Sequence, residues 1–436
     1  TRVEQAGAAS IESIFTALGH SDLAVRQDPI SWEKFVEMPV DWRNRALGTD
    51  IDTRRLAART PESYTKKTIA ILEKTWHGGN STRHTFLINE AEVLAGRLGY
   101  NADTQPWLRF IMSSMYASLA HALGASRAHL VRSDRDFRAL IKHVRKDLRF
   151  HKIRDEDISA HGKPSQTDVS KREHGFALSQ TSKRIHHSRK RFQMNRTLRR
   201  EIRLVHHALQ SKWIDPWRPL GHMVPRDPSA TAWSDSSLSA AGGFSYDMGF
   251  WWYIEWPQDI AQRTLRFVSS NKDGKLVTIN ALEYASLIVN YVAATYVLVH
   301  LDPSKTDPHP VVLFYADNTA AESWMKKASS SSEGARALGY IQAALMINNP
   351  VGICVDRVST TDNVVADRIS RVRSETHLAT EIPALCQDFP QLRSCQRFHP
   401  SAELTSLILE TLSTKKYVDP LQASRRVLTS PGRITT

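Results

Sequence analysis

The residues with the clearest chemical potential in this sequence are four acids, each placed where a strand or helix is expected to begin or end. In chain order they are Asp235, Glu283, Asp317 and Asp367. Carboxylates gathered in one pocket would repel each other strongly, so they require a divalent cation such as Mg²⁺, with Mn²⁺ as a possible substitute. Two Mg²⁺ ions held in this way can split a phosphodiester bond by in-line attack of water.

Each of the four acids also has an ordinary structural interpretation. Asp235 could form an Asx turn, and Glu283 lies three residues after Asn280, at the spacing of a capping box. Asp317 could cap the next helix, and Asp367 could complement a helix dipole. Taken singly these roles compete well with metal binding. Their occurrence together, each at an element end, favours the metal site.

The pattern of residues 228–372 predicts the elements that must position these acids. We expect strands opening at 232–234 and covering 244–254, 264–268, 311–316 and 351–358, with helices at 280–298, 318–325, 335–347 and 363–372. This order predicts an α/β fold in which helices flank a mixed central sheet. Asp317 then follows a buried strand, where sites of α/β proteins are commonly built.

The flanking regions carry different patterns. Upstream, a strand at 49–53 precedes helices expected at 60–76, 87–98, 107–123 and 133–146, which together predict a small helical bundle. Residues 150–190 lack an apolar period and are interpreted as a mobile linker. Downstream, residues 373–436 show one clear helix at 402–412 and a polar tail. The dense aromatic run at 251–256 favours core packing over stacking on bases.

The net charge of +13 favours a polyanionic partner, with nucleic acid the first candidate. Nine Lys or Arg residues and one acid, Glu201, lie between Lys183 and Arg203. This segment would contact a nucleic-acid backbone, although a solvated helix face explains it equally well. The candidate contact residues are Lys183, Arg184, Arg189, Lys190, Arg191 and Arg196.

The three cysteines, Cys354, Cys386 and Cys395, are too few and too scattered for a disulfide framework or a zinc site. They fit a reducing compartment, so we expect an intracellular location, cytoplasmic or nuclear. The longest apolar stretch, 281–301, is interrupted by polar residues, and no membrane partner is expected. The chain begins with Thr1 rather than Met, which suggests a fragment or a processed product.

At the acidic segments the chain resembles the ribonuclease H domain of retrotransposon reverse transcriptases. Residues 363–371, Asn-Val-Val-Ala-Asp-Arg-Ile-Ser-Arg, resemble the Asn-x-x-Ala-Asp-x-x-Ser-Arg ending of that family. Residues 235–243 resemble its first strand, and 282–283 and 316–318 resemble its second and third acidic positions. The resemblance implies a ribonuclease H-like fold. It also implies two Mg²⁺ ions bound by Asp235, Glu283, Asp317 and Asp367.

Upstream segments extend the resemblance. Residues 47–54 are similar to the strand after the polymerase catalytic loop, and 90–98 to a helix of the thumb, closest in character to DIRS-like or gypsy-like elements. The expected regions are therefore a palm remnant (1–60), a helical thumb or connection (61–149), a basic linker (150–195), a ribonuclease H-like domain (196–372) and a C-terminal extension (373–436).

Two departures from that family bear on activity. The sequence contains no adjacent pair of Asp residues, and the fingers and most of the palm are missing, so no polymerase activity is expected. No His lies between Asp317 and Asp367, where some ribonucleases H carry one that is thought to help product leave. This second departure concerns the turnover rate more than metal binding.

These observations predict a Mg²⁺-dependent endonuclease that hydrolyses the RNA strand of an RNA–DNA hybrid. Three alternatives stay open. The first is a catalytically silent, transposon-derived module that binds nucleic acid, and the second is a purely structural connection module. The third is a transposase or integrase of the same broad fold. In that last class the Glu would come last of the acids, whereas here Glu283 comes second.

Overall fold

The computed structural model describes residues 43–46, 48–80, 82–113, 115–117, 191–223, 226–269, 277–301, 309–328, 332–427 and 431–435. Every structural statement below concerns this part of the chain. Most of the region expected to be a palm remnant (1–60), the helix expected at 133–146 and the linker expected at 150–190 lie outside it. So do four of the candidate nucleic-acid contacts, namely Lys183, Arg184, Arg189 and Lys190.

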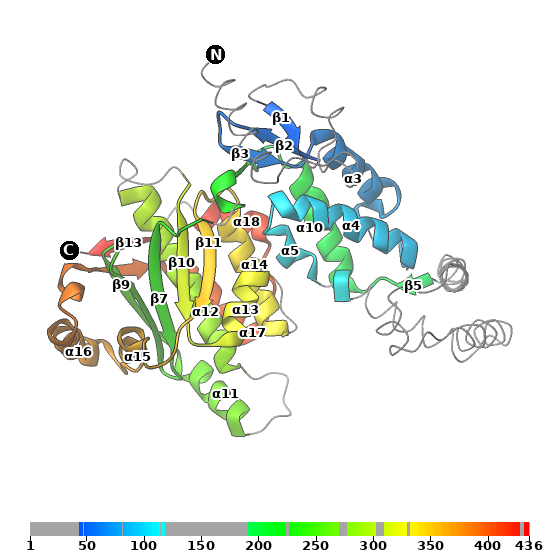
Figure 1. Ribbon diagram of the computed structural model, residues 1–436. Coiled ribbons are helices and arrows are strands. Elements are labelled where there is room, and N and C mark those ends of the chain that lie inside the picture. The colour runs from blue at the N-terminus through cyan, green and yellow to red at the C-terminus, as the bar shows by residue number, and fades with distance from the viewer. Residues whose placement is uncertain are drawn as a thin grey trace, which may run out of the picture.

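A seven-stranded mixed sheet forms the centre of the molecule (Figure 1), with strand order β11-β10-β7-β8-β9-β12-β13. Its strands are β7 (Ala230–Ser236), β8 (Ala240–Ser245), β9 (Phe250–Glu255), β10 (Val311–Ala316), β11 (Gly352–Arg357), β12 (Gln396–Pro400) and β13 (Gly432–Thr435). Strands β7, β8 and β9 form an antiparallel meander. Strand β10 runs parallel to both β7 and β11. The expected α/β class with a mixed sheet is confirmed.

Helices cover both faces of this sheet (Figure 1). The larger core contains α12 (Ile279–Tyr296), α13 (Thr319–Lys327), α14 (Glu333–Met346) and α17 (Ala402–Thr414). The smaller core contains α15 (Val364–Ser370) and α16 (Glu375–Asp388). Strand β9 faces both cores, because Trp252 packs in the larger one and Trp251 and Tyr253 in the smaller one. The prediction that the aromatic run packs in the core is confirmed.

Two strand predictions in this region were wrong. The single strand expected at 244–254 is a hairpin, since β8 ends at Ser245 and β9 begins at Phe250 after a turn in which Gly249 takes φ +65°. The strand expected at 264–268 belongs to helix α11 (Gln258–Ser269). Its buried residues Ile260 and Thr264 are four positions apart, which is a helical spacing.

The C-terminal region, 373–436, contains more secondary structure than the one helix and polar tail that the sequence predicted. The helix expected at 402–412 is present as α17, but α16, a short 3₁₀ helix (Pro390–Ser394) and α18 (Pro420–Val427) accompany it. Strand β12 pairs in parallel with β9, and β13 pairs with β12 in antiparallel fashion. This region therefore extends the central sheet beyond the edge at β9.

The N-terminal part combines a small sheet with helices. Strands β1 (Arg43–Ala46), β2 (Thr49–Asp52), β3 (Ala57–Arg59) and β6 (Arg218–Pro219) form the sheet. A two-stranded sheet joins β4 (Thr85–Leu87) to β5 (Arg191–Gln193). The helices are α3 (Glu62–Lys74), α4 (Ile88–Thr104), α5 (Leu108–Ile111) and α10 (Arg196–Gln210), with 3₁₀ turns at His77–Gly79 and Leu220–His222. The predictions of a strand at 49–53 and of helices at 60–76 and 87–98 are confirmed.

A buried acid joins this part to the central domain. Glu201 of α10 is 2% exposed. It accepts hydrogen bonds from the Tyr340 hydroxyl on α14 at 3.0 Å and from the Met115 backbone N–H at 3.1 Å. A buried carboxylate is costly unless it is hydrogen-bonded, so these contacts fix α10 against α14.

Helix α12 continues into a π-helical turn (Val297–Leu301), and Ile279–Leu301 is long and apolar enough to cross a membrane by length and composition alone. Its most apolar window is 67% buried inside the protein. The helix carries the buried polar residues Glu283, Ser286 and Asn290. Asn290 accepts a 3.0 Å hydrogen bond from the Trp252 indole, which ties the helix to β9. In this setting α12 packs as a core helix.

Candidate metal centre

Three elements bring three of the predicted acids to one edge of the sheet. Asp235 lies near the end of β7, and Asp317 follows the last residue of β10, the parallel neighbour of β7. The carboxyl ends of parallel strands meet at one edge, so these side chains are close. Glu283 comes from the beginning of α12. Asn318 donates a 2.9 Å hydrogen bond to Asn280, which fixes the start of α12 beside the end of β10.

The geometry removes two of the ordinary interpretations. Thr278, and not Asn280, caps α12, and its side chain accepts a hydrogen bond from the Ala281 backbone N–H. Glu283 is therefore not part of a capping box. Likewise Asn318 caps α13, which leaves the Asp317 carboxylate available for another role.

Asp235, Glu283 and Asp317 each offer one ligand oxygen, and these oxygens all lie within 4.8 Å of one another. Asp235 is 6% exposed and Glu283 5% exposed. Burial raises the pKa of Asp235 to about 6, with the charges of Asp317 and Asp367 acting in the same direction and the hydrogen bond from Ser370 opposing them. Burial, followed by the charge of Asp235, raises the pKa of Glu283 well above its ordinary value.

The residues present fit a hard divalent cation. The Oε2 atom of Glu283 is buried and has no hydrogen-bond partner among the described residues. An orphaned buried carboxylate oxygen is costly, and a cation bound within this triad would compensate it. Ligand sets made only of carboxylate oxygens suit Mg²⁺, Mn²⁺ or Ca²⁺ rather than zinc or copper. The part of the expectation that concerns an acidic metal site at Asp235, Glu283 and Asp317 is therefore supported by geometry.

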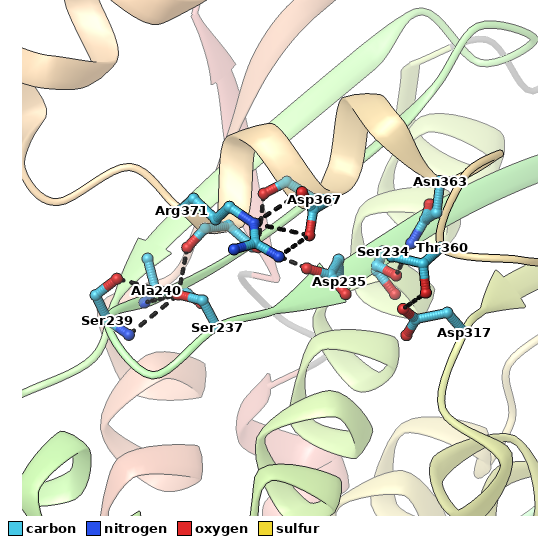
Figure 2. A network of polar contacts seen from close by, with 11 residues as sticks. Ser234, Asp235, Ser237, Ser239, Ala240, Asp317, Thr360, Asn363, Asp367 and Arg371 are labelled. Atoms are coloured by element: carbon cyan, nitrogen blue, oxygen red, sulfur yellow. Dashed lines mark hydrogen bonds and ion pairs between the residues drawn. The ribbon is translucent and has the colours of Figure 1, made fainter. Parts of the chain in front are cut away.

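Asp367 lies near this triad but is not a member of it. It sits in the first turn of α15, and its field contributes to the raised pKa of Asp235. Both of its carboxylate oxygens are taken by the Arg371 guanidinium: Arg371 Nε lies 2.9 Å from Oδ1 and 2.8 Å from Oδ2, and its Nη2 lies 2.7 Å from Oδ1. Figure 2 shows this pair beside Asp235.

A glycine sets the approach of α15 to the sheet. Gly242 on β8 pairs with Asp235 on β7. A Cβ atom on Gly242 would lie 2.7 Å from Cβ of Ile369, which real Cβ atoms essentially never show. The absence of a side chain at this position is therefore what allows α15, and with it Asp367, to lie so close to Asp235.

Three residues that position the acids were given no functional role from the sequence, and two of them, Thr360 and Arg371, are labelled in Figure 2. Thr360 Oγ1 donates to Asp317 at 3.0 Å, Ser370 Oγ donates to Asp235 at 2.6 Å, and Arg371 holds Asp367. Ser370 and Arg371 follow Asp367 by three and four positions, so helical spacing predicts a shared face. The contacts to β7 and β10 carry no local sequence signal.

Only two of the candidate nucleic-acid contacts lie in the described part of the chain. Arg191 is an exposed residue of β5, and Arg196 is an exposed residue in the first turn of α10. Figure 1 shows β5 beyond the helices of the N-terminal part, away from the edge of the central sheet that carries the acids. These residues are therefore separate from the candidate metal centre.

Comparison with known proteins adds no relative: no protein-family model matches the chain, and neither a curated protein nor a solved structure matches it.

Proposed function

We propose that this protein is a ribonuclease H-type enzyme, a Mg²⁺-dependent endonuclease that hydrolyses the RNA strand of an RNA–DNA hybrid. The observation that carries the proposal is the triad of buried Asp235, buried Glu283 and half-buried Asp317, in which one Glu283 oxygen has no hydrogen-bond partner. The mixed sheet is compatible with the ribonuclease H-like fold that the sequence motifs imply. The order of the four acids supports hydrolysis over the transposase alternative, because Glu283 is second among them.

Each residue has a defined part in this proposal. Asp235, Glu283 and Asp317 would hold the metal, with Asp367 as a fourth ligand at its margin. Bound Mg²⁺ supplies an activated water and neutralises charge on the leaving oxygen. Ser370 and Thr360 hold the Asp235 and Asp317 carboxylates in position through their hydroxyls. Such positioning contacts are commonly worth 10- to 100-fold in metal affinity or activity.

The substrate assignment rests on charge and on the sequence resemblance. The net charge of +13 suits a polyanion. The exposed Arg191 and Arg196 would contact the backbone without selecting a sequence, as would their neighbours between 183 and 190. The retrotransposon origin and the intracellular location belong to the same proposal.

The test is cleavage of an end-labelled RNA–DNA hybrid in Mg²⁺, comparing the intact chain with Asp317→Asn. Asp356→Asn is the matched control, because Asp356 is an exposed residue on the neighbouring strand β11. We expect cleavage by the intact chain and by the control, and at least a 100-fold loss in Asp317→Asn. Equal cleavage by all three proteins would indicate a contaminating nuclease and contradict the assignment of the site.

The competing function is a silent module that binds nucleic acid. Binding of the hybrid by a folded protein, with no Mg²⁺-dependent cleavage of RNA, DNA or hybrid, would overturn the enzymatic proposal in its favour. Cleavage of duplex DNA in preference to the hybrid would retain the metal centre but contradict the substrate.

A further inference from the structure

The guanidinium of Arg371 occupies the place where a cation would neutralise Asp367. Three N–O distances of 2.7 to 2.9 Å join the two side chains, and this fork engages both carboxylate oxygens. An arginine guanidinium stays charged in proteins, so this pair is ionic. The triad therefore has an unpartnered oxygen available for metal, whereas the fourth acid is already neutralised.

The ion pair between Arg371 and Asp367 is exposed enough for each side chain to change partner. The Arg371 side chain is 68% exposed and that of Asp367 is 23% exposed. Ion pairs at i,i+4 on a solvated helix surface change an equilibrium constant by only about a factor of two. A competing anion for Arg371 and a competing cation for Asp367 could therefore separate them readily.

Arg371 is not what holds α15 to the protein. Arg368, on the same helix, donates to Glu381 at 2.7 Å and to Asp388 at 2.5 Å, both on α16. The Arg368 side chain is only 29% exposed. Since Arg368 anchors α15 to α16, the more exposed Arg371 is available for a different role.

We propose that Arg371 is a gate for the second metal position, a proposal that rests on the function proposed above. In the free protein it neutralises Asp367, and the centre takes one divalent cation on the triad. When a nucleic-acid phosphate reaches the site, the Arg371 fork exchanges Asp367 for that phosphate, because guanidinium binds phosphate as well as carboxylate in two-point fashion. Asp367 is then free to bind the second cation, so the centre is completed only with substrate present.

The test is the number of Mn²⁺ ions bound per chain, measured by electron paramagnetic resonance of free Mn²⁺ during titration. The intact chain is expected to bind one ion when free and two with a hybrid whose RNA strand is 2′-O-methylated and resists cleavage. Arg371→Gln should bind two ions without the hybrid. Asp367→Asn should bind one under both conditions, and Arg373→Gln, at an exposed arginine beyond the end of α15, should behave like the intact chain. Arg371→Met decides the question in the same way should Arg371→Gln fail to fold.

The possible outcomes distinguish the gating role of Arg371 from the proposed nuclease activity. Suppose that the intact chain and Arg371→Gln each bind one ion without the hybrid, and that the intact chain still cleaves the hybrid. This result would overturn the gating role of Arg371 and would leave the proposed nuclease activity unaffected. Two ions bound by the free intact chain would also overturn the gate. No Mn²⁺ binding and no cleavage by the folded intact chain would overturn both proposals.

Discussion

Ser370 Oγ donates a 2.6 Å hydrogen bond to Oδ2 of Asp235, although 135 positions separate the two residues in sequence. The bond joins α15, on one face of the sheet, to the end of β7. The turn that follows β7 also supports the same serine, because the Ser237 hydroxyl donates to the Ser370 carbonyl at 2.6 Å. The helix that carries Asp367 is therefore tied directly to the strand that carries Asp235.

Ser370→Ala should weaken the metal centre without unfolding the protein. Removing the hydroxyl frees the Asp235 carboxylate to rotate, so we expect a 10- to 100-fold loss in Mn²⁺ affinity and hybrid cleavage. Ser245→Ala is the matched control, since the buried Ser245 hydroxyl donates to the Thr231 carbonyl at the other end of β8. Similar metal affinity in Ser370→Ala and the intact chain would contradict the positioning role.

Glu283→Gln should stabilise the metal-free protein and abolish its metal-dependent activity. The substitution removes one of three neighbouring carboxylates, and burial already disfavours the charge of this one. We expect the metal-free melting temperature to rise, and both the Mg²⁺-induced rise and cleavage to be lost, measured by thermal denaturation with and without Mg²⁺. In Glu255→Gln, where Glu255 is exposed at the end of β9, both quantities should stay as in the intact chain. A metal-free melting temperature that falls in Glu283→Gln would argue against a repulsive triad.

The stability of the metal-free protein should depend on pH through the titration of Asp235. Its pKa is raised from 3.8 to about 6 in the folded state, so the folded protein binds the proton more tightly than the unfolded chain. This contribution is fully present below pH about 4 and is lost as pH rises through 6, on the order of 3 kcal/mol in total.

Comparison of Asp235→Asn with the intact chain isolates that contribution, because Asn does not titrate. We expect Asp235→Asn to gain stability over the intact chain as pH rises from 5 to 7.5 without metal. The Mg²⁺-induced stabilisation of the intact chain should grow over the same range, since the carboxylates become ionised. A stability difference that is constant with pH in denaturant titrations would refute the assignment of a raised pKa to Asp235.

Gly242→Ala should displace α15 and thereby Asp367. The new Cβ would lie 2.7 Å from Ile369 Cβ, so the helix must move away from β8. A displacement of about 1 Å near reacting groups can cost about 100-fold in rate, and we expect at least that loss together with a lower melting temperature.

Gly334→Ala provides the matched control for this substitution. Gly334 lies in α14, and a Cβ there meets nothing within 4 Å. We expect Gly334→Ala to be stabilised by about 0.5–1 kcal/mol, because Ala favours a helix over Gly, and to cleave normally. Normal cleavage by Gly242→Ala would show that the close packing of α15 on β8 is not needed.

The sequence by itself was enough to predict the α/β class, the strands around β7 and β10, and the helices α3, α4, α12 and α17. Such elements follow from local periodicity and from turn and cap residues, which are short-range properties. The sequence was also enough to place Asp235, Glu283 and Asp317 among four candidate acids, because each of the four lies at an element end. Local signals failed where residues 244–254, expected as one strand, form the β8–β9 hairpin, and where α11 replaces an expected strand.

Tertiary structure decided which acids meet and what each one contacts. The parallel pairing of β7 with β10 brings Asp235 to Asp317, and the packing of α12 on the sheet buries Glu283 without a hydrogen-bond partner. The bond from Ser370 to Asp235 depends on the packing of α15, which a glycine far along the chain permits. These contacts join residues separated by tens of positions or more, so they arise from burial and sheet pairing rather than from any local sequence pattern.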